Sequence, residues 1–306
     1  MQWWCAAVGV DWSWEWRAYP GVWLFILFVA LLFPLLRRVA GTAGGDTRGR
    51  PVVYGLGVLA LWIALDWPVG ALGGGYLASL HMVQFLTIAY VASPLLLLGV
   101  PRGVFERLAG NRVARGVLPG LTHPLIALVV FNLIVALTHL PAPTDFLMAS
   151  QLGSFALDMV WLTGGLVFWW PVCATWPARP WMSPPVQVGY LAAQIIAGTP
   201  IFAYIAFADL PLYATYELAP RVHGISARSD QQTAGLLMKT MGMPILLVAS
   251  AIIFLRWAKR EYYPDVTCEA APGNLLMNDE DAIAKGSVAK FSPPIQSETH
   301  RQALWD

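Results

Sequence analysis

Charged residues are scarce in this chain. Asp, Glu, Lys and Arg make up 12% of its 306 residues, whereas 57% are hydrophobic and the mean hydropathy is +0.58. A water-soluble domain carries about 25% charged residues. The composition therefore excludes a soluble globular protein and predicts a membrane protein. The net charge of +1 indicates no nucleic-acid partner.

Cysteine and the common catalytic motifs are also rare or missing. The three cysteines, Cys5, Cys173 and Cys268, lie far apart in the sequence, and neither Cys-x-x-Cys nor His-Glu-x-x-His occurs. The glycines at 73–75 precede no Lys-Ser or Lys-Thr, which a phosphate-binding loop requires. No long polar region could hold a nucleotide-binding fold. We therefore expect no catalytic site, and so no enzyme.

What the chain has in abundance is long apolar stretches. A helix needs roughly 20 apolar residues to cross the hydrocarbon core, because backbone polar groups must be paired there. The sequence predicts an all-α, polytopic bundle of seven transmembrane helices. The predicted spans are Tyr19–Leu36, Val52–Trp67, Tyr76–Gly99, Leu121–Leu140, Ser150–Cys173, Val186–Ala208 and Thr233–Leu255.

Basic residues predict the orientation, because Lys and Arg in short loops are retained on the cytoplasmic side. Twelve of them follow the first, third, fifth and seventh spans, but only Arg17, Arg221 and Arg228 lie on the other side. The amino terminus is therefore expected outside and the carboxyl terminus in the cytoplasm. The three cysteines then fall at three different levels, which excludes a disulfide between them.

The two ends of the chain differ from its middle in composition. Residues 1–18 contain five tryptophans and no apolar signal-peptide core, so we expect an outer interfacial segment. Residues 19–260 form the transmembrane domain. Residues 261–306 are polar and contain several prolines, which predicts a disordered cytoplasmic tail.

Polar residues within or beside the spans gather at the predicted outer ends. A polar side chain in a span is costly unless it is paired or faces water. We therefore predict a polar cavity near the outer face, although residues this close to the interface can also simply reach water. The residues expected to shape it are Asp66, Gln84, Asp158, Asp230 and Gln231.

Asp158 lies deepest of these residues and needs a partner. It is about 12 Å below its outer end, and Lys239 lies about 10 to 12 Å down the seventh span at 1.5 Å per residue. Matching depth predicts an Asp158–Lys239 ion pair, as a structural contact or as part of a proton relay.

Histidine and methionine suggest a metal at the same depth. His81 begins the third span and His139 ends the fourth, so both imidazoles are expected at one level, beside Met82. Imidazole and thioether ligands suit Cu(I). Methionine also fills apolar cores, and that interpretation stays open for Met82.

Four segments resemble the CtaG-like cytochrome c oxidase assembly proteins. They are HMVQFLTIAYVASPLLLLGVP at 81–101, THLP at 138–141, GGLVFWWPV at 164–172 and SDQQTAGLLMK at 229–239. The resemblance covers about Asp66 to Trp257. It implies a seven-span protein of the bacterial inner membrane that assists maturation of copper-containing terminal oxidases.

The chain departs from that family at two histidine positions. The family commonly has His-x-x-x-His at the start of the third span, and this chain has Phe85 at the second position. Asp158 stands where a further histidine is common, and Lys239 where an aromatic residue is expected. We interpret Asp158 and Lys239 as a joint replacement of one polar contact by another.

The sequence therefore predicts an assembly factor for a copper-dependent respiratory oxidase. It would bind or deliver copper through His81, His139 and Met82, or hold an oxidase subunit at the outer face. Two alternatives stay open: a metal-free accessory subunit of a larger membrane complex, and a small-solute or proton transporter that uses Asp158 and Lys239.

Overall fold

The computed structural model describes residues 2–7, 9–41, 49–174 and 182–262, and every regular element in these ranges is helical. They belong to the compact unit Met1–Glu261, except for Tyr262. The predicted disordered tail lies outside the described residues apart from its first two.

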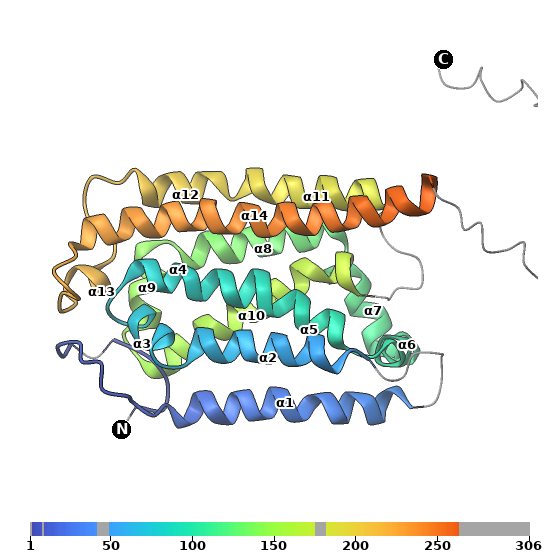
Figure 1. The fold of residues 1–306 in the computed structure, drawn as a ribbon, viewed down its shortest axis with the longest axis horizontal. Helices are drawn as coiled ribbons and strands as arrows, with labels where there is room; N and C mark the ends of the chain where they lie inside the picture. Colours follow the sequence, from blue (N-terminus) through green and yellow to red (C-terminus); the bar gives the residue numbers. More distant parts are fainter. Residues whose placement is uncertain (1, 8, 42–48, 175–181, 263–306) are drawn as a thin grey trace, which may run out of the picture. The chain divides into compact units, whose positions relative to one another are not determined.

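The helices run along one axis and form a bundle (Figure 1). The long helices are α1 (Pro20–Ala40), α2 (Pro51–Leu65), α8 (Pro124–Thr138), α10 (Gln151–Cys173), α11 (Pro184–Ala197) and α14 (Ala227–Tyr262). The shorter helix α12 (Thr199–Ala206) continues α11. A further span is built from α4 (Ala78–Leu86), the π-helical turn η1 (Thr87–Ala92) and α5 (Ser93–Gly99).

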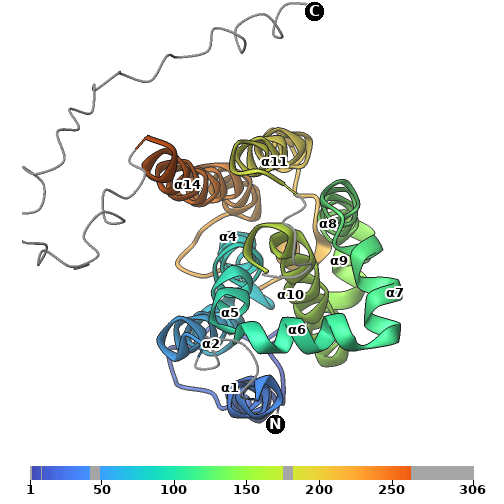
Figure 2. The same cartoon turned by 90° about the vertical axis from the view of Figure 1, so that its right-hand side faces the viewer.

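Short helices close the two ends of the bundle. At one end lie α3 (Val69–Gly73), α9 (Pro141–Met148) and α13 (Ala214–Glu217), close to the start of α4 (Figure 1). At the other end, α6 (Arg102–Gly110) and α7 (Arg112–Leu121) lie across the axis (Figure 2).

Proline marks where many of these helices begin. It occupies one of the first two positions of seven elements, one of which is α5 with Pro94. At the start of a helix its missing N–H costs no hydrogen bond. The other six are Pro20, Pro51, Pro124, Pro141, Pro184 and Pro200. These prolines thus mark where their helices begin, and the length of the apolar run sets the length of the helix.

All seven predicted stretches are helical, but the number of spans stays a prediction. Five helices are long and apolar enough to cross a membrane. A sixth is counted if α7 and α8, which are bent by 70°, form one broken span. The apolar helix α2 has 15 residues, fewer than a full crossing needs. The orientation also stays a prediction.

The α4–η1–α5 span lies at the centre of the bundle. Of the 18 residues in its most apolar stretch 67% are buried within the protein, whereas the share in α1, which lies at the outside, is 11%. It packs tightly against α10, because a Cβ at Gly165 would collide with Ser93 and Ala89. Small residues let helices approach in this way in membranes, where no hydrophobic effect drives them together.

The tryptophan-rich amino terminus is not wholly interfacial. Trp14 and Trp16 are exposed as expected, but Trp4 is 1% exposed and Cys5 is 3% exposed. The backbone N–H groups of Trp3 and Trp4 donate to Gln151 Oε1 at the start of α10. Trp4 and Cys5 therefore form part of the bundle core.

Candidate functional site

A small cavity lies where α4 begins and α8 ends. Its volume is about 10 Å³, close to the room that one water molecule or one metal ion requires. The side chains around it come from α4, α8, α9, α12, α14 and the segment between α12 and α14. The lining residues are Ala78, His81, Met82, Thr138, His139, Thr144, Ile205, Tyr213, Tyr216 and Ala234.

His139 directly follows α8 and is held in one ring orientation. Its Nδ1 lies 2.8 Å from the carbonyl oxygen of Val135, so Nδ1 carries the proton and donates to that carbonyl. Its Nε2 is then an unprotonated acceptor. That nitrogen is buried and has no hydrogen-bond partner among the described residues, so its lone pair is unused.

His81 lies in the first turn of α4 and has the same property. Its ring forms a hydrogen bond with the backbone of Gly73, and its buried Nε2 has no partner in the described part of the chain. Gly73 permits this approach, because a Cβ there would lie 3.0 Å from the His81 backbone nitrogen. The cavity thus contains two imidazoles, each with one unpaired nitrogen.

Trp161 of α10 supports both imidazoles. Its ring centroid lies 4.8 Å from that of His81, edge to face, and 6.1 Å from that of His139, stacked. Its Nε1 donates to Thr138 Oγ1 at 3.1 Å, and the Thr138 hydroxyl donates to the carbonyl of Ile134. These contacts limit the rotation of either imidazole.

Phe85 packs against the same group one turn further along α4. Its ring lies 4.9 Å from that of His139 and 5.3 Å from that of Trp161. Residues at i and i+4 share a helix face, so a histidine at this position would point toward His139 as His81 does. Phe85 instead places an apolar ring there.

Two tyrosines close the cavity from the segment that joins α12 to α14. The Tyr213 hydroxyl donates to the carbonyl of His139 at 2.7 Å, and the Tyr216 hydroxyl donates to the carbonyl of Gly73 at 2.8 Å. Burial raises the pKa of both phenols above its usual value. Both therefore stay neutral hydrogen-bond donors and hold the backbone on either side of the two imidazoles.

His81, His139 and Met82, the three predicted metal ligands, thus line one cavity. Two imidazoles and a thioether suit Cu(I), and the unpaired nitrogens fit such an ion. The described residues contain no group of three or more His, Cys, Asp or Glu that could hold a metal. Any metal site here would depend on methionine as well as histidine.

The five residues of the predicted polar cavity hold other segments in place. None of them lines the cavity described above, and their hydrogen bonds lie elsewhere. Asp158 accepts from Trp4 Nε1 at 2.8 Å and from Gln84 Nε2 at 2.9 Å. Asp66 accepts from the indoles of Trp23 and Trp62. Both carboxylates therefore hold tryptophans in place and do not hydrate a cavity.

The other two members of the predicted polar cavity hold segments near the start of α14. Asp230 accepts from the backbone N–H groups of Ala78 and Ser79, the first residues of α4. Gln231 Oε1 accepts from the backbone N–H of Leu212, and its Nε2 donates to the carbonyl of Leu210.

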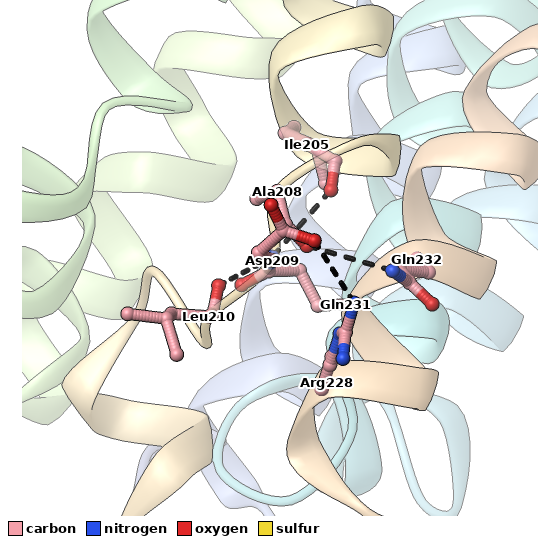
Figure 3. Close-up of polar contacts among 7 residues, drawn as sticks. All are labelled: Ile205, Ala208, Asp209, Leu210, Arg228, Gln231 and Gln232. Carbon is pink, nitrogen blue, oxygen red and sulfur yellow. Dashed lines mark hydrogen bonds and ion pairs between the residues drawn. The ribbon is translucent and has the colours of Figure 1, made fainter.

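Figure 3 shows Gln231 pointing into the segment that follows α12. Gln232 Nε2 donates to the carbonyl of Ala208 in the same segment. Beside them is an exposed ion pair of 3.1 Å between Arg228 and Asp209. Successive turns of α14 thus hold the segment that carries Tyr213 and Tyr216.

The predicted Asp158–Lys239 ion pair is wrong. Lys239 Nζ donates to the carbonyl of Ile195 at 3.0 Å and to Thr199 Oγ1 at 2.8 Å, at the junction of α11 and α12. Matching depth alone predicted the pair, and the sequence does not give the rotation of each helix about its axis. Lys239 faces α11, whereas Asp158 faces the amino-terminal segment.

The sequence interpretation missed the residues that orient the imidazoles. Trp161, Thr138, Tyr213 and Tyr216 act through contacts between distant segments, and no spacing pattern marks them. Trp4 was assigned to the membrane interface because of its tryptophan-rich neighbours. Its distance in sequence from Asp158 hid the contact.

The sequence profile of the cytochrome c oxidase caa3 assembly factor family matches residues 26–260. The chain belongs to this family. The match runs from within α1 to the last turn of α14 and includes both imidazoles. This assembly factor is therefore a multi-pass membrane protein.

A curated relative also matches a short part of this assembly factor. An allantoinase from Rubrobacter xylanophilus is 40% identical over 65 residues, which is 21% of this chain and 13% of that protein. So short a match carries no activity across. No solved structure matches the chain.

Proposed function

We propose that this assembly factor serves a copper-containing terminal oxidase in the bacterial inner membrane and carries one Cu(I) ion as cargo. His81, His139 and Met82 would bind the ion in the cavity between α4 and α8. Its role would be to bind and hand over the metal, without catalysis. Its partner would be an oxidase subunit that exposes a copper site on the same side of the membrane.

One observation carries the proposal: two buried imidazole nitrogens in one cavity have no hydrogen-bond partner among the described residues. Leaving such a group unpaired costs about 1 to 3 kcal/mol. A bound metal would use both lone pairs and remove this cost. The hydrogen bond from His139 Nδ1 to Val135 leaves Nε2 free to bind it, as in many metal sites where the other ring nitrogen is held by a carbonyl.

The test is copper stoichiometry under anaerobic conditions. The protein is loaded with Cu(I), freed of excess metal and measured for copper per chain. We expect about one copper in the wild type and a strong loss in a His81→Ala, His139→Ala double variant. A His123→Gln, His223→Gln double variant is the control, because it also removes two imidazoles but neither lines the cavity. X-ray absorption should then report nitrogen and sulfur ligands.

A metal-free accessory role is the second candidate, and Phe85 favours it. This ring fills the place beside His139 where a further ligand would point. If neither the wild type nor either double variant binds copper, the metal-free accessory role is favoured. Stable co-purification with an oxidase complex would then support a scaffold that holds a subunit. The transporter alternative loses its premise, because Asp158 and Lys239 have different partners.

A further inference from the structure

A second, larger cavity lies at the opposite end of the bundle, beside α6. Its volume is about 160 Å³. Arg50, Arg102 and Arg256 line it, together with Phe105, Cys173 and several backbone and apolar groups. Figure 2 views this end, where α6 begins beside α5 and lies across the axis of the bundle. Nothing in the copper proposal uses this cavity.

The three arginines reach the cavity from different parts of the chain. Arg50 precedes α2, Arg102 begins α6 and Arg256 lies in α14. No acidic residue is among the lining residues that the structure describes, and none of the three arginines forms an ion pair with a described residue. Each guanidinium has five N–H donors and stays charged. Three like charges around one cavity repel each other unless an anion lies between them.

The backbone around the cavity fixes its shape. The Arg50 N–H donates to the carbonyl of Gly99 at the end of α5, at 3.1 Å. Gly49 has a φ of +61°, and a Cβ there would lie 2.9 Å from that same carbonyl oxygen. Helix α6 begins at this point without a side-chain cap, so N–H groups of its first turn add partial positive charge.

We propose that this cavity binds a phosphate group, either the headgroup of an anionic phospholipid or a free phosphate anion. Arginine forks match phosphate oxygens in pairs. Basic cavities between helices on the cytoplasmic side of membranes bind anionic headgroups. Leu98 borders the same cavity and is 39% exposed on the outer surface of the bundle, which places the anion site next to the position of lipid tails.

The experiment compares two matched variants of the full-length protein. The cavity variant carries Arg50→Gln, Arg102→Gln and Arg256→Gln. The control variant carries Arg37→Gln, Arg38→Gln and Arg260→Gln, which removes the same charge from the ends of α1 and α14 but leaves the cavity intact. Thermal unfolding is measured in phosphatidylcholine nanodiscs with and without phosphatidylglycerol. A second series titrates inorganic phosphate against chloride of equal ionic strength in neutral detergent.

We expect phosphatidylglycerol or phosphate to raise the Tm of the wild type and of the control variant. Each arginine near an anionic headgroup contributes about fivefold in affinity, so the cavity variant should bind about 100-fold more weakly. A rise with the lipid alone identifies a headgroup site, and a rise with inorganic phosphate shows that the free anion binds as well. If the triple variant does not fold, the three single Gln variants are measured instead, each with the fivefold loss.

Three results would overturn the proposal. The first is a wild type that gains no stability from either source, and the second is a cavity variant that keeps the full gain. An equal loss in the cavity and control variants would show that overall charge, and not this cavity, attracts the anion. That last result is expected if anionic lipid binds the basic end of the bundle as a whole and not these three arginines.

Discussion

Trp4→Phe tests whether the amino-terminal segment is a structural part of the bundle. The Trp4 side chain is 1% exposed, and its Nε1 donates to Asp158 Oδ2 at 2.8 Å. Phenylalanine keeps an aromatic ring but removes this donor, so Asp158 keeps only Gln84 as a side-chain partner. Leaving one acceptor of this buried carboxyl group unpaired costs about 1 to 3 kcal/mol, and the smaller ring leaves a gap that costs about 1 kcal/mol more.

We therefore expect Trp4→Phe to lower the free energy of unfolding by about 3 kcal/mol. The assay is equilibrium unfolding of the purified protein in mixed micelles of mild detergent and increasing SDS, followed by fluorescence and circular dichroism. Trp16→Phe is the matched control, because that side chain is 61% exposed and keeps its ring stack with Trp23 after the change. The control should change stability by less than about 0.5 kcal/mol.

A double-mutant cycle separates the hydrogen bond from ring packing. With Asp158→Asn as the second change, we expect a coupling energy of about 1.5 kcal/mol or more between positions 4 and 158. Additive effects, or a Trp4→Phe loss equal to that of Trp16→Phe, would refute the contact. The amino-terminal segment would then lie at the membrane interface, as its composition alone suggests.

Three further predictions follow from other contacts. The effects of Lys239→Met and Asp158→Asn on the free energy of unfolding should add within about 0.5 kcal/mol in the same assay, because the two side chains share no partner. A coupling energy above about 1 kcal/mol would show that the two side chains do form an ion pair. Burial, followed by the charges of Asp158 and Asp66, raises the pKa of the Cys5 thiol well above 9.0. Cys5 should therefore stay protonated and resist maleimide in the folded protein through pH 8, and react once SDS unfolds it; mass spectrometry of Cys5 labelling in the folded state checks this. Asp230→Ala should cost about 1 to 2 kcal/mol, because it removes the carboxylate that accepts from the first N–H groups of α4; Asp209→Ala, which breaks only the exposed ion pair, should cost less than about 1 kcal/mol.

The sequence by itself determined the class of this protein and the position of its helices. Apolar runs of spanning length and the prolines at helix starts act through local geometry, so they can be recognised without knowledge of the fold. Predicted Ser150–Cys173 and observed Gln151–Cys173 differ by one residue. The depth of His81, His139 and Met82 followed from the same helical rise, and they line one cavity.

Only the tertiary structure decided which way each side chain points. Rotation about a helix axis is set by packing against neighbours, so Asp158 and Lys239 could share a depth and still face different helices. For the same reason the sequence does not predict three other contacts. Trp161 packs against both imidazoles, Trp4 donates to Asp158, and three arginines line one cavity. Hydropathy and spacing determine one coordinate of a membrane helix, and the close packing of its neighbours determines the rest.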